Sequence, residues 1–339
     1  MKAEIKKRIE SDNNRVNLGN VLPLETPYVL MIDPSSACNH KCKFCPTGDN
    51  KLIKSTERFV GTLDYGKFQK IIDDCSDFKN PIKVLRLYKV GEPLVNPKFS
   101  QMIEYARSNS NIIKIETTTN GMGFNKELNR NIIKAGINQI NISVNGISSE
   151  KIYHYTKTKL DFKKYVENIK DLYKNKGDCE IYIKAIKQNL SEDEQKQFFD
   201  IFGNIADRIF LENISPAWPE FKFNDMPMKF NAGHYGQEII ERQVCPYLFY
   251  IMVVNSDGLV STCVQDWKQH MIVGDTSTES IKDIWLGDRL NNYRFNHLDG
   301  NKTSYQACHN CEVMSYGVLD NIDSMSEIIK SKILKGQFL

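Results

Sequence analysis

The sequence predicts an α/β fold organised around a parallel β-sheet. Short apolar runs rich in β-branched residues alternate about six times with longer segments of helical periodicity, a pattern typical of repeated strand–helix units. The apolar runs are mostly continuous, which favours parallel strands covered on both faces. The predicted strands are Tyr28–Asp33, Val84–Tyr88, Ile112–Thr118, Ile140–Val144, Ile181–Ile186 and Arg208–Leu211. The alternation alone does not distinguish a barrel from a doubly wound sheet.

The remaining elements follow in order along the chain. Residues 1–24 are expected to form a charged helix, Glu4–Glu10, and then a connector through Gly19 and Pro23. The helices predicted between the strands are Tyr65–Cys75, Lys98–Arg107, Lys126–Ala135 and Glu192–Phe202. Because the active site of a parallel α/β barrel lies at the C-terminal ends of its strands, the polar residues just after each strand are the first candidates for a site.

The composition excludes several classes of protein. The chain has 339 residues, 41% of them hydrophobic, which is enough for one large and one smaller domain. A net charge of +3 without a long basic run gives no electrostatic footprint for nucleic acid. No apolar stretch approaches the roughly 18 residues that a membrane span needs, and the charged N-terminus is unlike a secretory signal. We therefore expect a cytoplasmic protein with no membrane partner.

Three cysteines follow the first predicted strand, in the run Cys38-Asn-His-Lys-Cys42-Lys-Phe-Cys45. The C-x3-C-x2-C spacing lets one loop hold three corners of a [4Fe–4S] cluster, which usually takes four thiolates, so the fourth iron is left open and reactive. A zinc site or a structural role is the alternative, although zinc sites tolerate much looser spacing. The nine cysteines are odd in number and clustered, which favours metal ligation over disulfide pairing.

A second set of cysteines lies near the C-terminus. The segment from Cys245 to Cys263 predicts a β-hairpin, with two apolar strands joined by an Asn-Ser-Asp-Gly turn that ends at Gly258. The hairpin brings its two cysteines together, and Cys308-His-Asn-Cys311 supplies a second pair. The four thiols suit one cubane or one tetrahedral site, so zinc is again the alternative. Two cysteines remain and are expected to be structural: Cys75 and Cys179.

The first cysteine loop resembles the signature of the radical S-adenosylmethionine (SAM) superfamily, in which an aromatic residue, here Phe44, precedes the last cysteine. The resemblance implies an open, partial (β/α)6 barrel over residues 25–220. It also implies that the open iron binds the amino and carboxylate groups of SAM, and that one electron then cleaves SAM to a 5′-deoxyadenosyl radical. An external donor such as flavodoxin or ferredoxin is expected to supply the electron. The three cysteines Cys38, Cys42 and Cys45 would carry this catalysis.

Further SAM contacts are implied by motifs that follow the other strands. The run Gly91-Glu92-Pro93 resembles the Gly-Glu-Pro motif that orients the amino group of SAM, with Val90 in place of the first glycine of its common form. The other positions that resemble SAM contacts are Thr119, Asn120 and Ser143, the last in a run that resembles Ser-x-Asp-Gly with Asn145 replacing the acid. Lys184 could pair with the methionine carboxylate as a point charge. A plain turn is the alternative for the Gly-Glu-Pro run, and an outward-facing strand lysine for Lys184.

The second cysteine set resembles the twitch form of the SPASM auxiliary domain, whose pattern is C-x9–15-G-x4-C followed by C-x2-C. The run from Gly274 to Trp285 resembles that family as well. The resemblance implies one auxiliary [4Fe–4S] cluster ligated by four cysteines. It divides the rest of the chain into a linker, 221–244, and a twitch domain with a C-terminal helix, 245–339.

These resemblances predict a radical SAM oxidoreductase with two [4Fe–4S] clusters. The runs Val21–Tyr28, Cys45–Asp49 and Leu85–Pro93 resemble members associated with surface-polysaccharide and aminocyclitol pathways. The chain is also similar to 2-deoxy-scyllo-inosamine dehydrogenase, which carries a twitch domain as well. We therefore expect an alcohol of a sugar, nucleotide-sugar or aminocyclitol to be oxidised to a ketone, with the auxiliary cluster accepting an electron. A sugar epimerase, a maturase of ribosomal peptides and a metal-stabilised binding protein without catalysis are the alternatives. Expected substrate contacts are Tyr88, Arg86, Glu212, Trp218 and Glu220.

Overall fold

A computed structural model describes residues 1–9, 16–223 and 231–339 of the chain. Ten strands form one sheet in the order β1-β7-β6-β5-β4-β3-β2-β8-β9-β10. The six central strands are parallel and neighbour one another in sequence order, which is the arrangement of a barrel wall and not of a doubly wound sheet. They are β2 (Val29–Ile32), β3 (Ile82–Leu87), β4 (Ile112–Thr119), β5 (Gln139–Val144), β6 (Glu180–Ile186) and β7 (Arg208–Glu212). The predicted partial barrel is confirmed.

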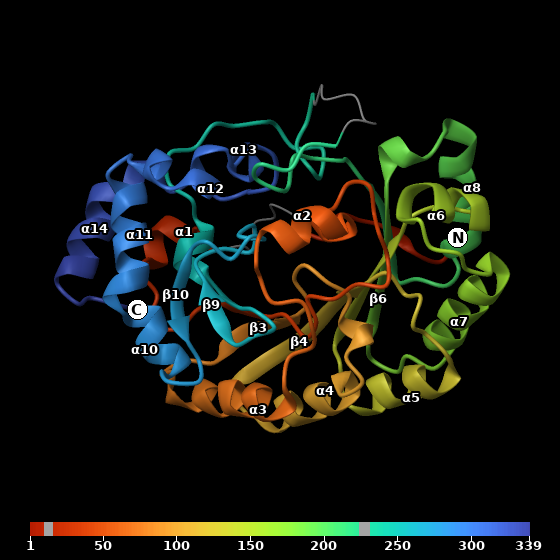
Figure 1. Ribbon diagram of the computed structural model, residues 1–339, viewed down its shortest axis with the longest axis horizontal. Helices are drawn as coiled ribbons and strands as arrows, with labels where there is room; N and C mark the ends of the chain where they lie inside the picture. The colour runs from red at the N-terminus through yellow and green to blue at the C-terminus, as the bar shows by residue number, and fades with distance from the viewer. Residues whose placement is uncertain (10–15, 224–230) are drawn as a thin grey trace.

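The helices between these strands cover one face of the sheet, as Figure 1 shows for α3, α4 and α5. Their bounds are α3 (Tyr65–Asp73), α4 (Phe99–Ser108), α5 (Lys126–Lys134), α6 (Ser149–Thr156), α7 (Phe162–Lys174) and α8 (Glu192–Phe202). Several begin where a short polar side chain accepts a first-turn backbone N–H, such as Asp64 for α3 and Asn125 for α5. The predicted helix Tyr65–Cys75 ends at Asp73, and a 3-10 turn, η2 (Asp74–Asp77), carries the buried Cys75.

The two faces of the parallel sheet differ in polarity. On the helix-covered face, Leu30, Leu85 and Ile142 belong to the main hydrophobic core. On the other face, neighbouring strands are joined by ion pairs between Arg86 and Glu116 and between Lys184 and Glu212. Side chains alternate between the faces of a strand, so the inner face of the partial barrel carries charged groups that can form a site.

The N-terminal segment does not form the helix predicted over Glu4–Glu10. Residues 4–5 form a short strand, β1 (Glu4–Ile5), that pairs in parallel with β7, and Glu10 lies outside the described residues. The N–H groups of Glu4 and Lys6 donate to carbonyls of Asp207 and Ile209. An edge strand offers unpaired backbone groups that attract another chain segment, and this pairing overrides the local preference of a charged segment for a helix. A short helix, α1 (Leu18–Val21), follows.

The C-terminal region continues the same sheet from the other edge of β2. Strand β8 (Ile251–Val254) pairs in parallel with β2 and forms the predicted hairpin with β9 (Leu259–Ser261), to which β10 (Ile272–Asp275) adds. One helical turn, α9 (Tyr247–Tyr250), separates Cys245 from β8, so the first strand is shorter than predicted.

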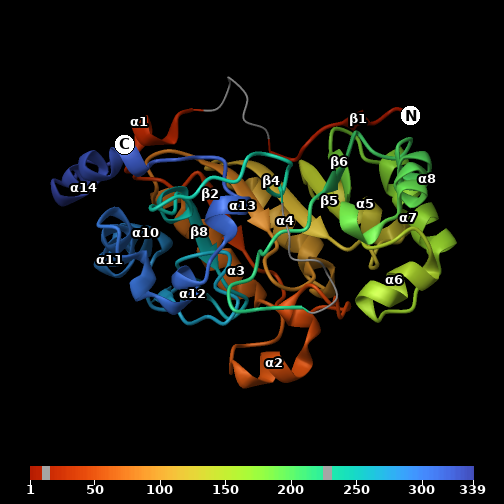
Figure 2. The same ribbon diagram turned by 90° about the horizontal axis from the view of Figure 1, so that it is seen from above.

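Helices pack around this hairpin, as Figure 2 shows for α10, α11 and α12. Their bounds are α10 (Ile281–Leu286), α11 (Asp288–Leu298), α12 (Gln306–His309), α13 (Val313–Tyr316) and α14 (Ser326–Leu334). Leu18 and Leu22 of the N-terminal segment share a hydrophobic cluster with Ile329 and Ile333 of α14. None of the helices in the described part of the chain is long and apolar enough to cross a membrane.

Candidate active site and cysteine clusters

The loop after β2 gathers the first three cysteines in consecutive tight turns. The N–H of Cys45 donates to the carbonyl of Cys42 at 3.2 Å, and the N–H of Gly48 donates to the carbonyl of Cys45 at 2.9 Å. A side chain at Gly48 would put a Cβ atom 2.4 Å from the carbonyl oxygen of Cys42. The loop therefore closes around its thiols because position 48 is glycine. A 3-10 turn, η1 (Pro46–Gly48), and a helix, α2 (Asn50–Ser55), complete it.

The first cysteine set fits an iron–sulfur cluster better than a set of free thiols. Burial raises the pKa of the Cys38 thiol to about 12, and neighbouring Cys45 and Glu92 add to the rise. Burial likewise raises the pKa of Cys42 and Cys45. Thiolates bind metals, and bound metal ions stabilise that charge. Three half-buried thiols carried by one loop thus suit a group that brings its own positive charge.

The Gly-Glu-Pro run packs directly against the start of the cysteine loop. A Cβ atom at Gly91 would lie 2.0 Å from the carbonyl oxygen of Ser35, so only glycine fits there. The N–H of Glu92 donates to the carbonyl of Ala37 at 3.0 Å. These contacts hold Gly91 and Glu92, two of the predicted SAM contacts, beside the loop that carries Cys38. Pro93 begins a 3-10 turn, η3 (Pro93–Val95).

Glu92 meets two further predicted residues in the interior. Its carboxylate accepts hydrogen bonds from the Thr119 hydroxyl at 2.5 Å and from the Asn120 N–H at 2.8 Å. Burial raises the pKa of Glu92 to about 7, although these hydrogen bonds oppose the rise. The Asn120 side chain in turn donates to Asn39 of the cysteine loop at 2.7 Å. Residues from the ends of β3 and β4 are thus joined to the loop after β2.

Three more predicted residues lie on the inner face of β5, β6 and β7, where Ser143 pairs in register with Lys184. Lys184 donates to a carboxylate oxygen of Glu212 at 2.5 Å, and His234 lies 3.1 Å from the same oxygen. Burial alone would raise the pKa of Glu212, but the charge of Lys184 and the hydrogen bond with His234 outweigh it and hold this pKa well below its usual range. The other oxygen, Oε1, has no partner among the described residues. Lys184 therefore has a carboxylate partner inside the protein.

A second buried charge cluster lies deeper on the same face. Arg8 and Arg86 both donate to Oε1 of Glu116, at 2.6 and 2.8 Å, and Arg8 also donates to the hydroxyl of Tyr88. Sequence reasoning did not anticipate Arg8 or His234. Neither has a local motif, since each reaches the barrel from a segment without regular structure.

The second cysteine set converges as the hairpin predicts. Cys245, Cys263, Cys308 and Cys311 line one small apolar cavity together with Met271 and Met314. Burial is the main cause that raises the pKa of each of these four thiols. Four thiols around one apolar cavity match the donor set of a cubane cluster. Cys75 and Cys179 are buried elsewhere in the hydrophobic core, as expected of structural cysteines.

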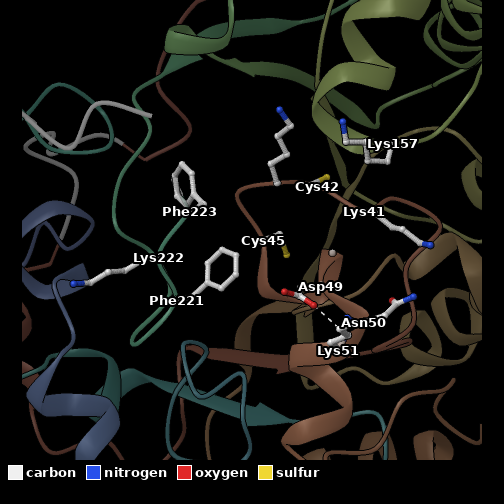
Figure 3. A pocket seen from close by; sticks show the side chains of 12 residues that line it. Lys41, Cys42, Cys45, Asp49, Asn50, Lys51, Lys157, Phe221, Lys222 and Phe223 are labelled. Carbon is white, nitrogen blue, oxygen red and sulfur yellow. Dashed lines mark hydrogen bonds between the residues drawn. The ribbon is translucent and has the colours of Figure 1, made fainter. Parts of the chain in front are cut away.

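Two larger cavities lie beside one another, one next to each cysteine set. The first, of about 590 Å³, is lined by Cys42, Cys45 and five lysines. Figure 3 shows Phe221 and Phe223 facing its cysteine side. The second, also of about 590 Å³, is lined by Trp218, Glu220 and Cys311. Residues 221–223 line both cavities and so form a shared wall between them.

The remaining predicted residues contact other protein side chains or lie in the first cysteine loop. Trp218 packs against Ile53, Val90 and Trp267, which is a packing role at the edge of the second cavity. Glu220 pairs with Lys268. Phe44 is half-buried in the first cysteine loop.

Comparison with protein families agrees with this geometry. Residues 32–195 match the Radical SAM superfamily, and residues 245–312 match SPASM, an iron–sulfur cluster-binding domain. The chain contains a radical SAM domain followed by a SPASM domain. The cofactors of this radical SAM protein are accordingly SAM and iron–sulfur clusters.

Two curated relatives of this protein have names that describe different activities. The radical SAM protein is 22% identical over 337 residues to the tungsten-containing aldehyde ferredoxin oxidoreductase cofactor-modifying protein of Pyrococcus furiosus, across 84% of this chain and 87% of that one. It is 28% identical over 130 residues to the GTP 3′,8-cyclase of Vibrio vulnificus, and this match spans only 37% of that relative's length and 38% of this chain.

Solved structures share its fold. BtrN in complex with AdoMet and 2-DOIA matches 87% of this chain and 97% of its own, with a TM-score of 0.55 and 16% identity. Streptococcus suis SuiB bound to the precursor peptide SuiA matches 93% of this chain and 79% of its own, with a TM-score of 0.61 and 15% identity.

Proposed function

We propose that this radical SAM protein oxidises an alcohol carbon of a carbohydrate-like substrate to a ketone. The observation that carries the proposal is the shared wall at residues 221–223, which lines one cavity with Cys42 and Cys45 and another with Cys311. A substrate held against this wall would lie between the two cysteine sets. That position suits a reaction that takes a hydrogen atom on one side and an electron on the other.

The cofactor sites are assigned to the residues that the fold brings together. Cys38, Cys42 and Cys45 would hold the SAM-binding [4Fe–4S] cluster, and Cys245, Cys263, Cys308 and Cys311 the auxiliary cluster. With these groups bound, SAM supplies the 5′-deoxyadenosyl radical that takes a hydrogen atom from carbon, and the auxiliary cluster accepts one electron. The Glu92 carboxylate, which Thr119 and Asn120 orient, would accept a hydrogen bond from the SAM ammonium group.

The remaining contacts with SAM follow the predicted positions. Phe44, Gly91, Pro93 and Ser143 would complete the contacts with SAM. Lys184 already pairs with Glu212, so we assign it to the substrate side of the site and no longer to the methionine carboxylate.

Oxidation of the alcohol to a ketone removes one hydrogen atom, one proton and one electron from the substrate. The C–H bond breaks by loss of a hydrogen atom, the hydroxyl proton goes to a base, and one electron leaves as the C=O bond forms. His234, 3.1 Å from Glu212, is the base that we propose, because the Glu212 carboxylate stabilises the imidazolium that results.

The lysines favour a substrate that carries phosphate. The first cavity is lined by Lys41, Lys43, Lys51, Lys157 and Lys222, and lysine binds phosphate as a point charge. A nucleotide-sugar combines phosphates with oxidisable hydroxyls. Two comparisons support this class: BtrN was solved with the small molecule 2-DOIA, and GTP 3′,8-cyclase is named for a nucleotide.

Peptide modification is the second candidate, because SuiB bound to its precursor peptide matches 93% of this chain with a TM-score of 0.61. The two cavities that meet at residues 221–223 could also accept an extended chain.

The test begins with anaerobic reconstitution using iron and sulfide. We expect about eight irons per chain, as two cubane clusters require, and 5′-deoxyadenosine after addition of dithionite and SAM. Cys42→Ala should abolish SAM cleavage, whereas the matched control Cys179→Ala, at a buried structural cysteine, should retain it. Deuterated nucleotide-sugars should transfer deuterium to 5′-deoxyadenosine and yield a ketone. Deuterium transfer from peptides alone would overturn the substrate class, and bound zinc without SAM cleavage would refute the proposed activity.

A further inference from the structure

One buried histidine shares the cavity of the second cysteine set. His297, on α11, is 1% exposed and lines the cavity with Cys245, Cys263, Cys308 and Cys311. Its Nδ1 atom accepts a hydrogen bond from the backbone N–H of Cys245 at 3.3 Å. Its Nε2 atom is buried and has no hydrogen-bond partner among the described residues. A buried polar atom without a partner is costly, so the position calls for an acceptor.

The hydrogen bond at Nδ1 determines which ring nitrogen carries the proton. A nitrogen that accepts a hydrogen bond has its lone pair exposed, and the neutral imidazole then carries its single proton on the other nitrogen. Nε2 is therefore a donor, as an N–H group inside the cavity wall. Apart from His297 and the thiols, Gln265 is the one polar side chain that the described residues contribute to this lining. The rest are apolar or thioether groups such as Leu248 and Met271.

We propose that His297 Nε2–H donates a hydrogen bond to a sulfur of the auxiliary cluster and thereby raises its reduction potential. This inference rests on the proposed assignment of an iron–sulfur cluster to the four cysteines. Reduction adds negative charge to the cluster and its sulfurs, and a donor stabilises the more negative form. Hydrogen bonds from outside the ligand set are an established means of tuning a metal centre. His297 is thus a positioning residue that makes the cluster a better electron acceptor.

Two substitutions separate this role from a purely structural one. In His297→Asn, the side-chain oxygen can replace Nδ1 as the acceptor for Cys245, but no donor remains at the Nε2 position. In His297→Gln, the amide nitrogen can replace the Nε2 donor, but the acceptor for Cys245 is lost. Redox tuning predicts a lower potential for Asn and a nearly unchanged potential for Gln. A role confined to holding Cys245 predicts the reverse order.

The measurement is an EPR-monitored redox titration of the reconstituted auxiliary cluster. Cys38, Cys42 and Cys45 are changed to alanine in every sample, so that only the auxiliary cluster contributes to the signal. At a fixed applied potential, His297→Asn should lower the ratio of reduced to oxidised cluster about tenfold, which for one electron corresponds to about 59 mV. His309→Asn is the matched control, since this histidine lies between Cys308 and Cys311 but is exposed, and its titration should not change.

Iron content and pulsed EPR decide the question if a variant loses its cluster. About one cluster's iron, four per chain, is expected in this background, and no iron there would mean that the cluster assignment has failed and not the role of His297. If a His297 variant loses its cluster, the unsubstituted His297 protein labelled with ¹⁵N-histidine decides the question. A coupled histidine nitrogen with an exchangeable proton in the reduced cluster supports the proposal. Absence of that coupling, or equal potentials for the Asn variant and its parent, would overturn it.

Discussion

Changing Glu116 to glutamine should destabilise the barrel strongly, because the carboxylate holds two buried arginines. Arg8 and Arg86 lie 2.6 and 2.8 Å from its Oε1 atom, and Glu116 is 5% exposed. Burial alone would raise the pKa of Glu116, but the charges of Arg8, Arg86 and Lys114 outweigh it and lower the pKa from 4.5 to about 2. A difference of this size between the folded and unfolded chain is worth about 3 kcal/mol near neutral pH.

The pH dependence of this contribution has a definite sign. The pKa of Glu116 is lower in the folded chain, so the stabilisation is fully present above the unfolded value of 4.5 and is lost as the pH falls toward about 2. Urea unfolding, followed by tryptophan fluorescence, should give a free energy about 3 kcal/mol lower for Glu116→Gln than for the unsubstituted protein at pH 7. At pH 3 the difference should shrink to about 1 kcal/mol.

An exposed ion pair provides the matched control. Glu279 pairs with Arg289, and both side chains are about a third exposed or more. Glu279→Gln should change the free energy of unfolding by less than about 1 kcal/mol, as is usual for surface pairs. An equal effect of the two substitutions at pH 7, or a Glu116→Gln effect that grows on acidification, would refute the reasoning.

Three further predictions concern the site. Gly91→Ala should reduce 5′-deoxyadenosine formation by at least about tenfold, because its Cβ atom would lie 2.0 Å from a backbone carbonyl oxygen. The control Gly66→Ala, on the exposed face of α3, should have little effect. Equal rates for the two variants in an anaerobic SAM-cleavage assay would contradict this prediction. Cys308→Ala should lower the iron content from about eight toward about four per chain while SAM cleavage continues, and Cys75→Ala, at a buried core position, should keep about eight. An unchanged iron count for Cys308→Ala would exclude it as a ligand. Glu212→Gln should abolish ketone formation but not SAM cleavage, because it weakens the interactions with Lys184 and His234; product analysis that finds full turnover would remove Glu212 from the substrate site.

Much of the site could be predicted from the sequence because its signals are local. Cys38, Cys42 and Cys45 lie within one loop, and their spacing by itself determines how close the thiols can approach. The hairpin from Cys245 to Cys263 is also local, since the turn at Gly258 has a positive φ of 96° that favours glycine. The strand–helix alternation predicted all six parallel strands, because apolar periodicity reflects burial directly.

Other parts could not be predicted, because they depend on which distant segments become neighbours. The local sequence of the charged N-terminal segment predicts a helix, but residues 4–5 instead pair as a strand with the edge of β7. The ion pair between Lys184 and Glu212 depends on β7 lying beside β6. Arg8 reaches Glu116 across 108 positions of sequence, and no local pattern indicates such a contact.

The sequence by itself determined the family, the two cysteine sets and the positions of the parallel strands along the chain, since the signal for each lies in spacings of a few residues. Only the tertiary structure decided the partners of the buried charges, the shared wall at residues 221–223 and the position of His297 in the cavity of the second cysteine set. The physical reason is that a buried polar group needs a hydrogen-bond or ion-pair partner, and packing determines which groups lie close enough to be that partner. That partner is chosen by the neighbouring element in space and not by the neighbouring residue in sequence.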